Sequence, residues 1–265
     1  MYTSIQLAVK YIQYYLFAEN GKGHGVHSPF VYDLISQVLN DDRIFYSFQP
    51  IEDCRKTLQN SMTEITFQHF RSEPSIENAS IKSVATIAST SLKPKKYGQL
   101  LFRLVNYFTP QTIIELNTSL GITSAYMASA NFNANLFTLE ESTEIASIAA
   151  ANFEELGLSN TTFITGHFDD TLTKTLENIE LINFAFIDGI HQFESSIRYF
   201  EQVIQKSDEH TVIIIGDIHC SKEMEAAWID VKKHQSVTLT IDLFYVGIVF
   251  FRKEQKEKQH FVIRY

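Results

Sequence analysis

The chain has 265 residues, of which 45% are hydrophobic, and its net charge is −9. This composition supports a full hydrophobic core and argues against a disordered chain or a membrane protein. The acidic excess falls in residues 97–265, which carry 12 lysines and arginines against 22 acidic residues, so nucleic acid is a poor candidate partner.

Residues 1–95 are expected to form a mainly helical extension or lid. Apolar residues at helical spacing predict a helix over residues 4–18, where one stripe contains Ile5, Val9, Ile12 and Leu16. The polar residues among them argue against a signal peptide, and two cysteines cannot make a disulfide framework, so the cytoplasm is the expected compartment.

Further helices are expected along the rest of this extension. Ser28 and Pro29 have the residue types of an N-cap and a first helical position, which predicts a helix over residues 31–39. A polar segment at residues 71–80 predicts a mobile loop. The other predicted helices cover residues 51–62, 81–90 and 95–108.

Downstream, the pattern alternates between strands and helices, as a parallel sheet requires. Strands are predicted at residues 113–116, 136–140, 161–165, 183–188 and 211–217, and helices at 121–130, 142–156, 171–177, 193–205 and 223–234. Two last strand patterns, 238–243 and 247–251, are too close for a crossover helix and predict a hairpin.

Residues 96–265 are therefore expected to form a doubly wound α/β domain. Its sheet would have seven mostly parallel strands, with an antiparallel last strand. The extended segment at residues 260–265 is not placed by the pattern.

The segment from Thr112 to Ser124 predicts a ligand-binding strand, turn and helix. A short apolar strand carries Glu115 near its end, and Asn117, Ser119 and Gly121 form the small, polar turn before the helix. Small residues permit close approach of a ligand, and the helix N-terminus offers free N–H groups. Asn117 tolerates the left-handed backbone that such a turn needs.

The next strand ends in a second acid, Glu140, which is placed to accept hydrogen bonds from two ribose hydroxyls. The first turn lacks the glycine fingerprint for pyrophosphate, and Glu115 would repel phosphate. A carboxylate there suits a cationic end such as an amino-acid ammonium. A ribose and an ammonium without phosphate describe S-adenosylmethionine.

These residues resemble the class I S-adenosylmethionine-dependent methyltransferases, and most closely the small-molecule O-methyltransferase branch, including the macrolide-sugar and catechol types. The first motif of that branch commonly reads E-L-G-x-S-x-G, and Asn117 stands at its first glycine. The resemblance implies that Glu115, Asn117, Ser119 and Gly121 bind the cofactor with Glu140. It also implies that the segment Gly166–Asp170 contacts adenine through His167 or Asp169, although a polar loop that caps the next helix is an equal alternative. By analogy, Tyr97 and Gly98 would line the methionine end of the cofactor.

The segment Ile187-Asp-Gly-Ile-His191 resembles the D-G-x-H arrangement of antibiotic O-methyltransferases. In those enzymes the aspartate binds a metal and the histidine is the base, which implies these roles for Asp188 and His191, with Asp188 also facing the cofactor. Histidine titrates near neutral pH and so suits removal of a hydroxyl proton. The alternative is that Asp188 only caps the next helix.

A third cluster, Ile215-Gly-Asp-Ile-His-Cys220, follows the fifth strand. Asp217 and Asp188 would be the two carboxylates of a divalent metal site, with His219 as a substitute third ligand. Gly216 stands where the metal-dependent families offer another acid, so metal-independent catalysis is favoured. His219 is equally suited to be a second base or a substrate contact.

The expected activity is methyl transfer from S-adenosylmethionine to a hydroxyl of a small-molecule acceptor. A binding or assembly protein on a methyltransferase scaffold is the main alternative, because Asn117 and Gly216 depart from the usual pattern. A nucleotide-dependent oxidoreductase is disfavoured by the missing glycines. No nucleic-acid or membrane partner is expected, and a homodimer stays open.

Overall fold

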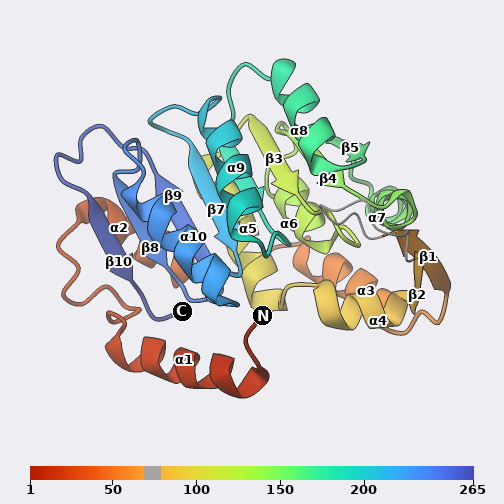
Figure 1. Ribbon diagram of the computed structural model, residues 1–265, viewed down its shortest axis with the longest axis horizontal. Coiled ribbons are helices and arrows are strands. Elements are labelled where there is room, and N and C mark those ends of the chain that lie inside the picture. Colours follow the sequence, from red (N-terminus) through yellow and green to blue (C-terminus); the bar gives the residue numbers. More distant parts are fainter. Residues whose placement is uncertain (69–78) are drawn as a thin grey trace. The chain divides into compact units, whose positions relative to one another are not determined.

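The computed structural model describes residues 1–68 and 79–265, and Figure 1 shows the order of their helices and strands. The chain divides into two compact units. The first unit combines residues 1–41 with 179–265, and the second is the continuous segment 42–178. The predicted loop at residues 71–80 falls almost entirely outside the described residues.

The N-terminal helices of the first unit begin where their capping residues predict. Helix α1, Ser4–Phe17, follows Thr3, whose side chain forms a capping box with Gln6. Ser28 caps α2, Pro29–Leu34, with Pro29 at the first turn, and this prediction is confirmed. The same helix continues as a π-helical turn, η1, Ile35–Leu39, which the sequence did not indicate.

The first unit contributes five strands to a mixed sheet. Their spatial order is β10-β8-β9-β7-β6, and they cover Phe184–Ile187 (β6), Val212–Gly216 (β7), Leu239–Asp242 (β8), Val246–Phe250 (β9) and Gln259–Val262 (β10). The predicted hairpin is confirmed, because β9 runs antiparallel to both β8 and β7. The predicted strand number was wrong: the sheet has eight strands, and the unplaced segment near residue 260 forms β10, parallel to β8.

Helices cover both faces of these strands. Helices α9, Phe193–Ile204, and α10, Lys222–Lys233, lie side by side on one face (Figure 1), where the Trp228 ring packs against Gly247 of β9. On the other face, Phe30 of α2 meets Phe250 of β9 at a ring distance of 5.0 Å. Residues 247 and 250 point to opposite faces of one strand, so the unit has three layers.

The second unit holds the other three strands of the mixed sheet. The parallel strands are β3, Thr112–Leu116, β4, Asn135–Glu140, and β5, Thr161–Thr165. Its helices in this region are α5, Lys95–Phe108, α6, Ile122–Ala130, α7, Thr143–Glu155, and α8, Phe168–Glu177. All three strands and the four helices occur where the sequence pattern predicts them, apart from an earlier start of α8, so the doubly wound α/β fold is confirmed.

The remaining part of the second unit differs from prediction. Helices α3, Phe48–Gln59, and α4, Val84–Ser91, flank an antiparallel pair of strands, β1, Glu64–Gln68, and β2, Ala79–Ser83. The helix predicted from residue 81 was wrong for residues 81–83, which pair with β1. The Ser83 side chain accepts a hydrogen bond from Thr86 N and so sets the helix start at Val84.

Within residues 1–68 and 79–265, no helix is both long and apolar enough to cross a membrane.

Candidate active site

The turn after β3 has the backbone conformation that the sequence predicts. Asn117, Ser119 and Gly121 all have positive φ angles, of 73°, 50° and 82°. The amides of Asn117 and Thr118 both donate to the carbonyl of Leu139 in the neighbouring strand, at 2.9 and 3.0 Å. The left-handed conformation expected at Asn117 is therefore confirmed, and it directs the turn back against β4.

Glu115 lies beneath this turn and is 0% exposed. Its carboxylate accepts hydrogen bonds from Thr123 at 2.8 Å, from Thr138 at 2.7 Å, and from Ser124. These hydroxyls belong to α6 and β4, so one buried carboxylate of β3 joins two neighbouring strands to the helix. Contact between Glu115 and the ammonium of a ligand stays a prediction.

Glu140, at the end of β4, is 6% exposed. One carboxylate oxygen accepts from Ser119 N at 2.8 Å, and the other accepts from Ser142 N at 3.1 Å. Burial raises the pKa of Glu140 above its ordinary 4.5, and the two N–H groups partly offset that rise. A carboxylate has about four lone-pair positions, so acceptor capacity is left for ligand hydroxyls.

His167 caps helix α8, which therefore begins at Phe168, earlier than predicted. Its ring accepts a hydrogen bond from Asp169 N at 3.2 Å, and the preceding Gly166 has a φ angle of 132°. The ring also lies 3.8 Å from Glu141, an acid that sequence reasoning did not select. Burial raises the pKa of Glu141, and the interaction with His167 partly offsets this rise. The cap role does not test the predicted adenine contact.

Tyr97 and Gly98, named by analogy for the methionine end, lie near the start of α5. Tyr97 is buried, and a side chain at Gly98 would overlap the ring of Tyr126 on α6. Gly98 thus permits close packing of these two helices, and its role toward a cofactor stays a prediction.

In the first unit, Asp188 ends the strand region of β6 and is buried. Gly189 follows with a φ angle of 68°, which confirms the expected sharp turn. The Asp188 carboxylate lies directly against the backbone of Gly216, at the end of β7. The second and third sequence clusters therefore meet in space, as predicted from adjacent strand tips.

His191 is exposed beyond this turn. Its Nδ1 atom lies 3.7 Å from the Cys220 thiol, so the segments that follow β6 and β7 approach each other there. Asp217 has a φ angle of 55°, and its amide donates to Tyr245 O at 2.6 Å. The backbone at this strand tip is thus held in an unusual conformation for a residue other than glycine.

His219 has two carboxylate partners. Its Nε2 atom lies 2.7 Å from Asp242, its Nδ1 atom lies 3.4 Å from Glu225, and its ring stacks on Phe244. Asp242 is buried and also accepts from the Trp228 indole at 3.1 Å. Both ring nitrogens therefore face acids, and neither is directed at an open coordination position.

Glu225 also connects α1 to this region. It accepts from the Tyr2 hydroxyl at 2.7 Å and pairs with Lys10 at 2.8 Å. Burial opposes ionisation of Glu225, but the hydrogen bonds from Lys10 and Tyr2 outweigh it and hold its pKa below 4.5. Sequence reasoning missed Glu225 and Asp242, because single acids at ordinary positions of a helix and a strand carry no motif.

No group of three or more His, Cys, Asp or Glu side chains in the described ranges is arranged to hold a metal ion. The metal assignment of Asp188, Asp217 and His219 therefore stays a prediction.

Comparison with known families agrees with the sequence motifs. Residues 114–218 match the family model described as a methyltransferase domain. This span contains the first motif, Glu140, His167, Asp188 and Asp217. No curated protein matches the chain.

Solved structures show the same fold at low sequence identity. An O-methyltransferase from Bacillus cereus in complex with SAH aligns with a TM-score of 0.56 and 19% identity, covering 83% of this chain and 97% of that one. The SAH-bound methyltransferase PaMTH1 of Podospora anserina aligns with a TM-score of 0.60 and 11% identity, covering 85% of this chain and 97% of that one. TomG of Streptomyces achromogenes, an O-methyltransferase solved with SAM, aligns with a TM-score of 0.53 and 18% identity. The alignment covers 61% of this chain and 82% of that one. These likenesses confirm the predicted fold.

Proposed function

We propose that this protein is an S-adenosylmethionine-dependent methyltransferase that acts on a hydroxyl oxygen of a small molecule. The observation that carries the proposal is the pairing of Glu140 with Ser119 N, which places an acid of β4 beside the turn after β3. This pairing lies within the segment that matches a methyltransferase domain. Neighbouring structures with the same fold bind SAM or SAH.

The residues of the second unit fit the proposed cofactor. Glu140 would accept hydrogen bonds from both ribose hydroxyls through its remaining lone pairs. The backbone of Asn117, Ser119 and Gly121 would lie close to the cofactor. Gly166 and His167 are proposed for the adenine. Glu115 is proposed mainly as a positioning residue, since its three hydroxyl partners tie the start of α6 and the strand β4 to β3, on both sides of the turn.

The residues of the first unit are proposed to prepare the acceptor. When bound, S-adenosylmethionine supplies an activated methyl group. His191 would take the hydroxyl proton as the acceptor oxygen receives that methyl, whose bond to the cofactor's sulfur would break with the electron pair left on sulfur. Asp188 and Asp217 would orient the acceptor or hold a divalent cation. His219, fixed between Asp242 and Glu225, is proposed to shape the site.

The two departures that favoured a silent scaffold have structural explanations. Asn117 adopts the left-handed conformation that a glycine would otherwise supply, and Gly216 leaves room for the Asp188 carboxylate. Neither departure therefore argues against catalysis.

We also propose that α1 joins two copies of the chain. Four apolar side chains spaced four, three and four residues apart form an exposed stripe, in which Ile5 is 78% and Ile12 is 57% exposed; the other two members are Val9 and Leu16. The opposite face, including Tyr14, packs on Phe244. This spacing is that of a helix-pairing seam, and a two-fold interface needs a self-complementary patch.

The charges around α1 favour a second copy over a lipid surface. Membrane-surface helices carry several basic residues on the polar face, whereas the only charged residue of α1 is Lys10, which Glu225 holds. The stripe is flanked by uncharged residues, so two copies would not repel each other there. A helix of 14 residues is about 21 Å long, so this seam alone predicts a weak dimer.

Calorimetric titration with S-adenosylmethionine, with NAD as the comparison, tests the proposed function. Saturable binding of the first alone, followed by methyl transfer to a member of a hydroxylated acceptor panel, is expected. Binding of NAD instead would overturn it. The cytoplasmic location and the division into an extension, 1–95, and a cofactor domain, 96–265, remain proposals, and limited proteolysis tests the latter.

A further inference from the structure

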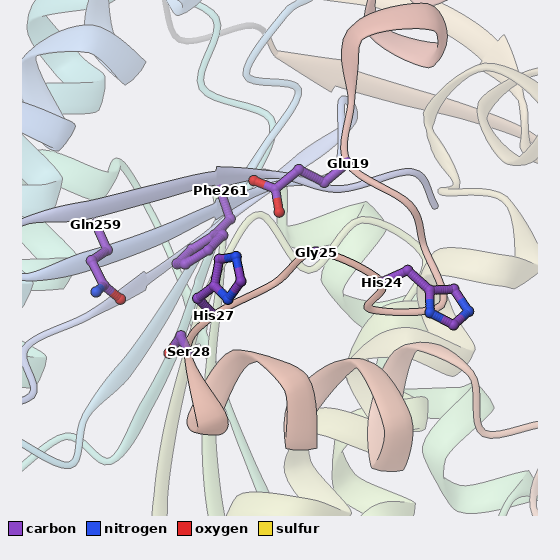
Figure 2. Close-up of a pocket in the computed structure, with 7 residues that line it drawn as sticks. All are labelled: Glu19, His24, Gly25, His27, Ser28, Gln259 and Phe261. Carbon is purple, nitrogen blue, oxygen red and sulfur yellow. The ribbon is translucent and has the colours of Figure 1, made fainter.

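A cavity of about 350 Å³ lies in the first unit, where the segment after α1 crosses the edge strand β10. Figure 2 shows it, with the side chains of Glu19, His27 and Phe261 drawn near one another and with His24 directed away. The other lining residues are Gly25, Ser28 and Gln259. A cavity of this size is at the lower end of the range for small-molecule sites.

The backbone fixes Glu19 at the rim of this cavity. Its amide donates to Val262 O at 2.7 Å, and its carbonyl accepts from Arg264 N at 3.1 Å. Glu19 therefore pairs with the end of β10 as a short parallel bridge at Ile263. The main-chain bonds fix the backbone of Glu19, so that its side chain starts from a set position at the rim.

In the described part of the chain, no lysine or arginine pairs with the Glu19 carboxylate, and His27 is the charged group that acts on it. No ion pair or side-chain hydrogen bond involves it among residues 1–68 and 79–265. Burial raises its pKa, and the nearby His27 only partly offsets that rise. A partly buried carboxylate without a fixed counter-charge is stabilised by any cation that enters the cavity.

Phe261 adds a second feature that selects a cation. Its ring lines the same cavity as Glu19 and His27, and the face of an aromatic ring attracts ammonium and guanidinium groups. No lysine or arginine lines the cavity, so an anion such as phosphate finds no permanent positive charge. A metal ion fits poorly, because no set of three metal-binding side chains occurs in the described ranges.

We infer that this cavity binds a small organic ammonium ion, which would pair with Glu19 and lie against the ring of Phe261. The ammonium could belong to a free amine or to a lysine side chain, and both present the same group. Neither the cofactor nor the acceptor of the proposed methyl transfer is needed for this site, so it can be tested separately.

Calorimetry on the full chain tests the inference. The probes are n-butylammonium chloride for a free amine and an acetylated, amidated Gly-Lys-Gly peptide for a lysine side chain, against sodium chloride at equal ionic strength. Saturable binding of at least one ammonium probe is expected, and the probe that binds more tightly identifies the source.

Two variants and one control assign the binding to this cavity. Glu19→Gln keeps the shape of the side chain and removes its charge, and it should weaken binding roughly tenfold. Phe261→Leu should weaken it several-fold, and Glu257→Gln, an exposed acid of the same unit, should have no effect. Three results would overturn the inference: no saturation by either ammonium probe, equal binding to Glu19→Gln, or phosphate binding that Glu19→Gln strengthens.

Discussion

The carboxylate of Asp188 occupies the space that a side chain at Gly216 would need. A Cβ atom built on Gly216 would lie 2.8 Å from the Asp188 Cγ atom and still closer to Oδ1. Gly216 has an ordinary φ angle, so its role is to leave space rather than to adopt a glycine-only conformation. The glycine that seems to weaken a metal site is thus what allows Asp188 to lie against β7.

Gly216→Ala should therefore displace Asp188 and lower turnover to about the level of Asp188→Ala, while S-adenosylmethionine affinity falls less. Steady-state kinetics and calorimetry measure the two effects. Gly157→Ala is the control, because open space surrounds Gly157 and its positive φ angle costs about 1–2 kcal/mol of stability without touching the site. Full activity of Gly216→Ala would contradict a catalytic role for Asp188.

The affinity for S-adenosylmethionine should depend on pH through Glu140. Its pKa is raised in the folded protein, so protonation begins above 4.5. Only the ionised form accepts from both ribose hydroxyls, so affinity should fall as the pH is lowered through this raised pKa. Glu140→Gln should lose about 1.5–3 kcal/mol of binding and should show no such pH dependence. Calorimetry at several pH values measures both, and equal affinity of the variant at neutral pH would remove Glu140 from the site.

Glu115→Gln should destabilise the fold. The variant replaces an acceptor oxygen by an NH₂ donor among three hydroxyls, at an expected cost of about 1–3 kcal/mol in the free energy of unfolding. Urea denaturation measures this, with Glu154→Gln on the exposed surface of α7 as the control. Normal stability with lost cofactor affinity would instead indicate direct contact between Glu115 and the ligand.

The attachment of α1 should weaken at acidic pH. Glu225 has a lowered pKa when folded, so its contribution to stability is fully present above 4.5 and is lost as the pH falls through the lowered value. Hydrogen exchange in α1, corrected for the intrinsic pH effect, should become faster in that range. Glu225→Gln should exchange fast at all pH values, whereas Glu194→Gln should behave like the natural chain. Identical protection of α1 in Glu225→Gln would show that the aromatic contacts alone hold the helix.

The apolar stripe on α1 should hold a concentration-dependent dimer. Ile12→Glu places a charge in the stripe and should give a monomer by sedimentation velocity. Gln6→Glu adds the same charge to the same helix but lies outside the stripe and keeps the capping box, so it should remain dimeric. A natural chain that is monomeric at high concentration, or that floats with lipid vesicles, would contradict the proposed seam.

The sequence predicts local structure well where one motif carries the signal. Ser28 with Pro29, the turn at Asn117 and the closely spaced strands β8 and β9 all form as expected. Strand β10 was not predicted, because a four-residue edge strand depends on a partner distant in the chain. Ile81 was assigned to a helix because its pairing with Thr66 depends on a strand that the sequence pattern did not reveal.

In the candidate site, too, contacts between elements distant in the chain could not be predicted from local motifs. The positions of Asp188 and Asp217 at neighbouring strand ends follow from the order of the strands. The pairing of His219 with Asp242 does not, because it joins residues of different elements that carry no shared motif. Likewise, the burial of Glu115 depends on hydroxyls contributed by three separate positions.

The bridge between Glu19 and Ile263 affects the order in which the two units can fold during synthesis. The first unit is discontinuous, and its edge strand closes on the segment after α1 only when both are present. Residues 42–178 form a continuous unit that is synthesised earlier and can become compact while the C-terminal strands are still missing. During synthesis, the face of α1 that packs on Phe244 therefore stays uncovered until the C-terminal strands are made.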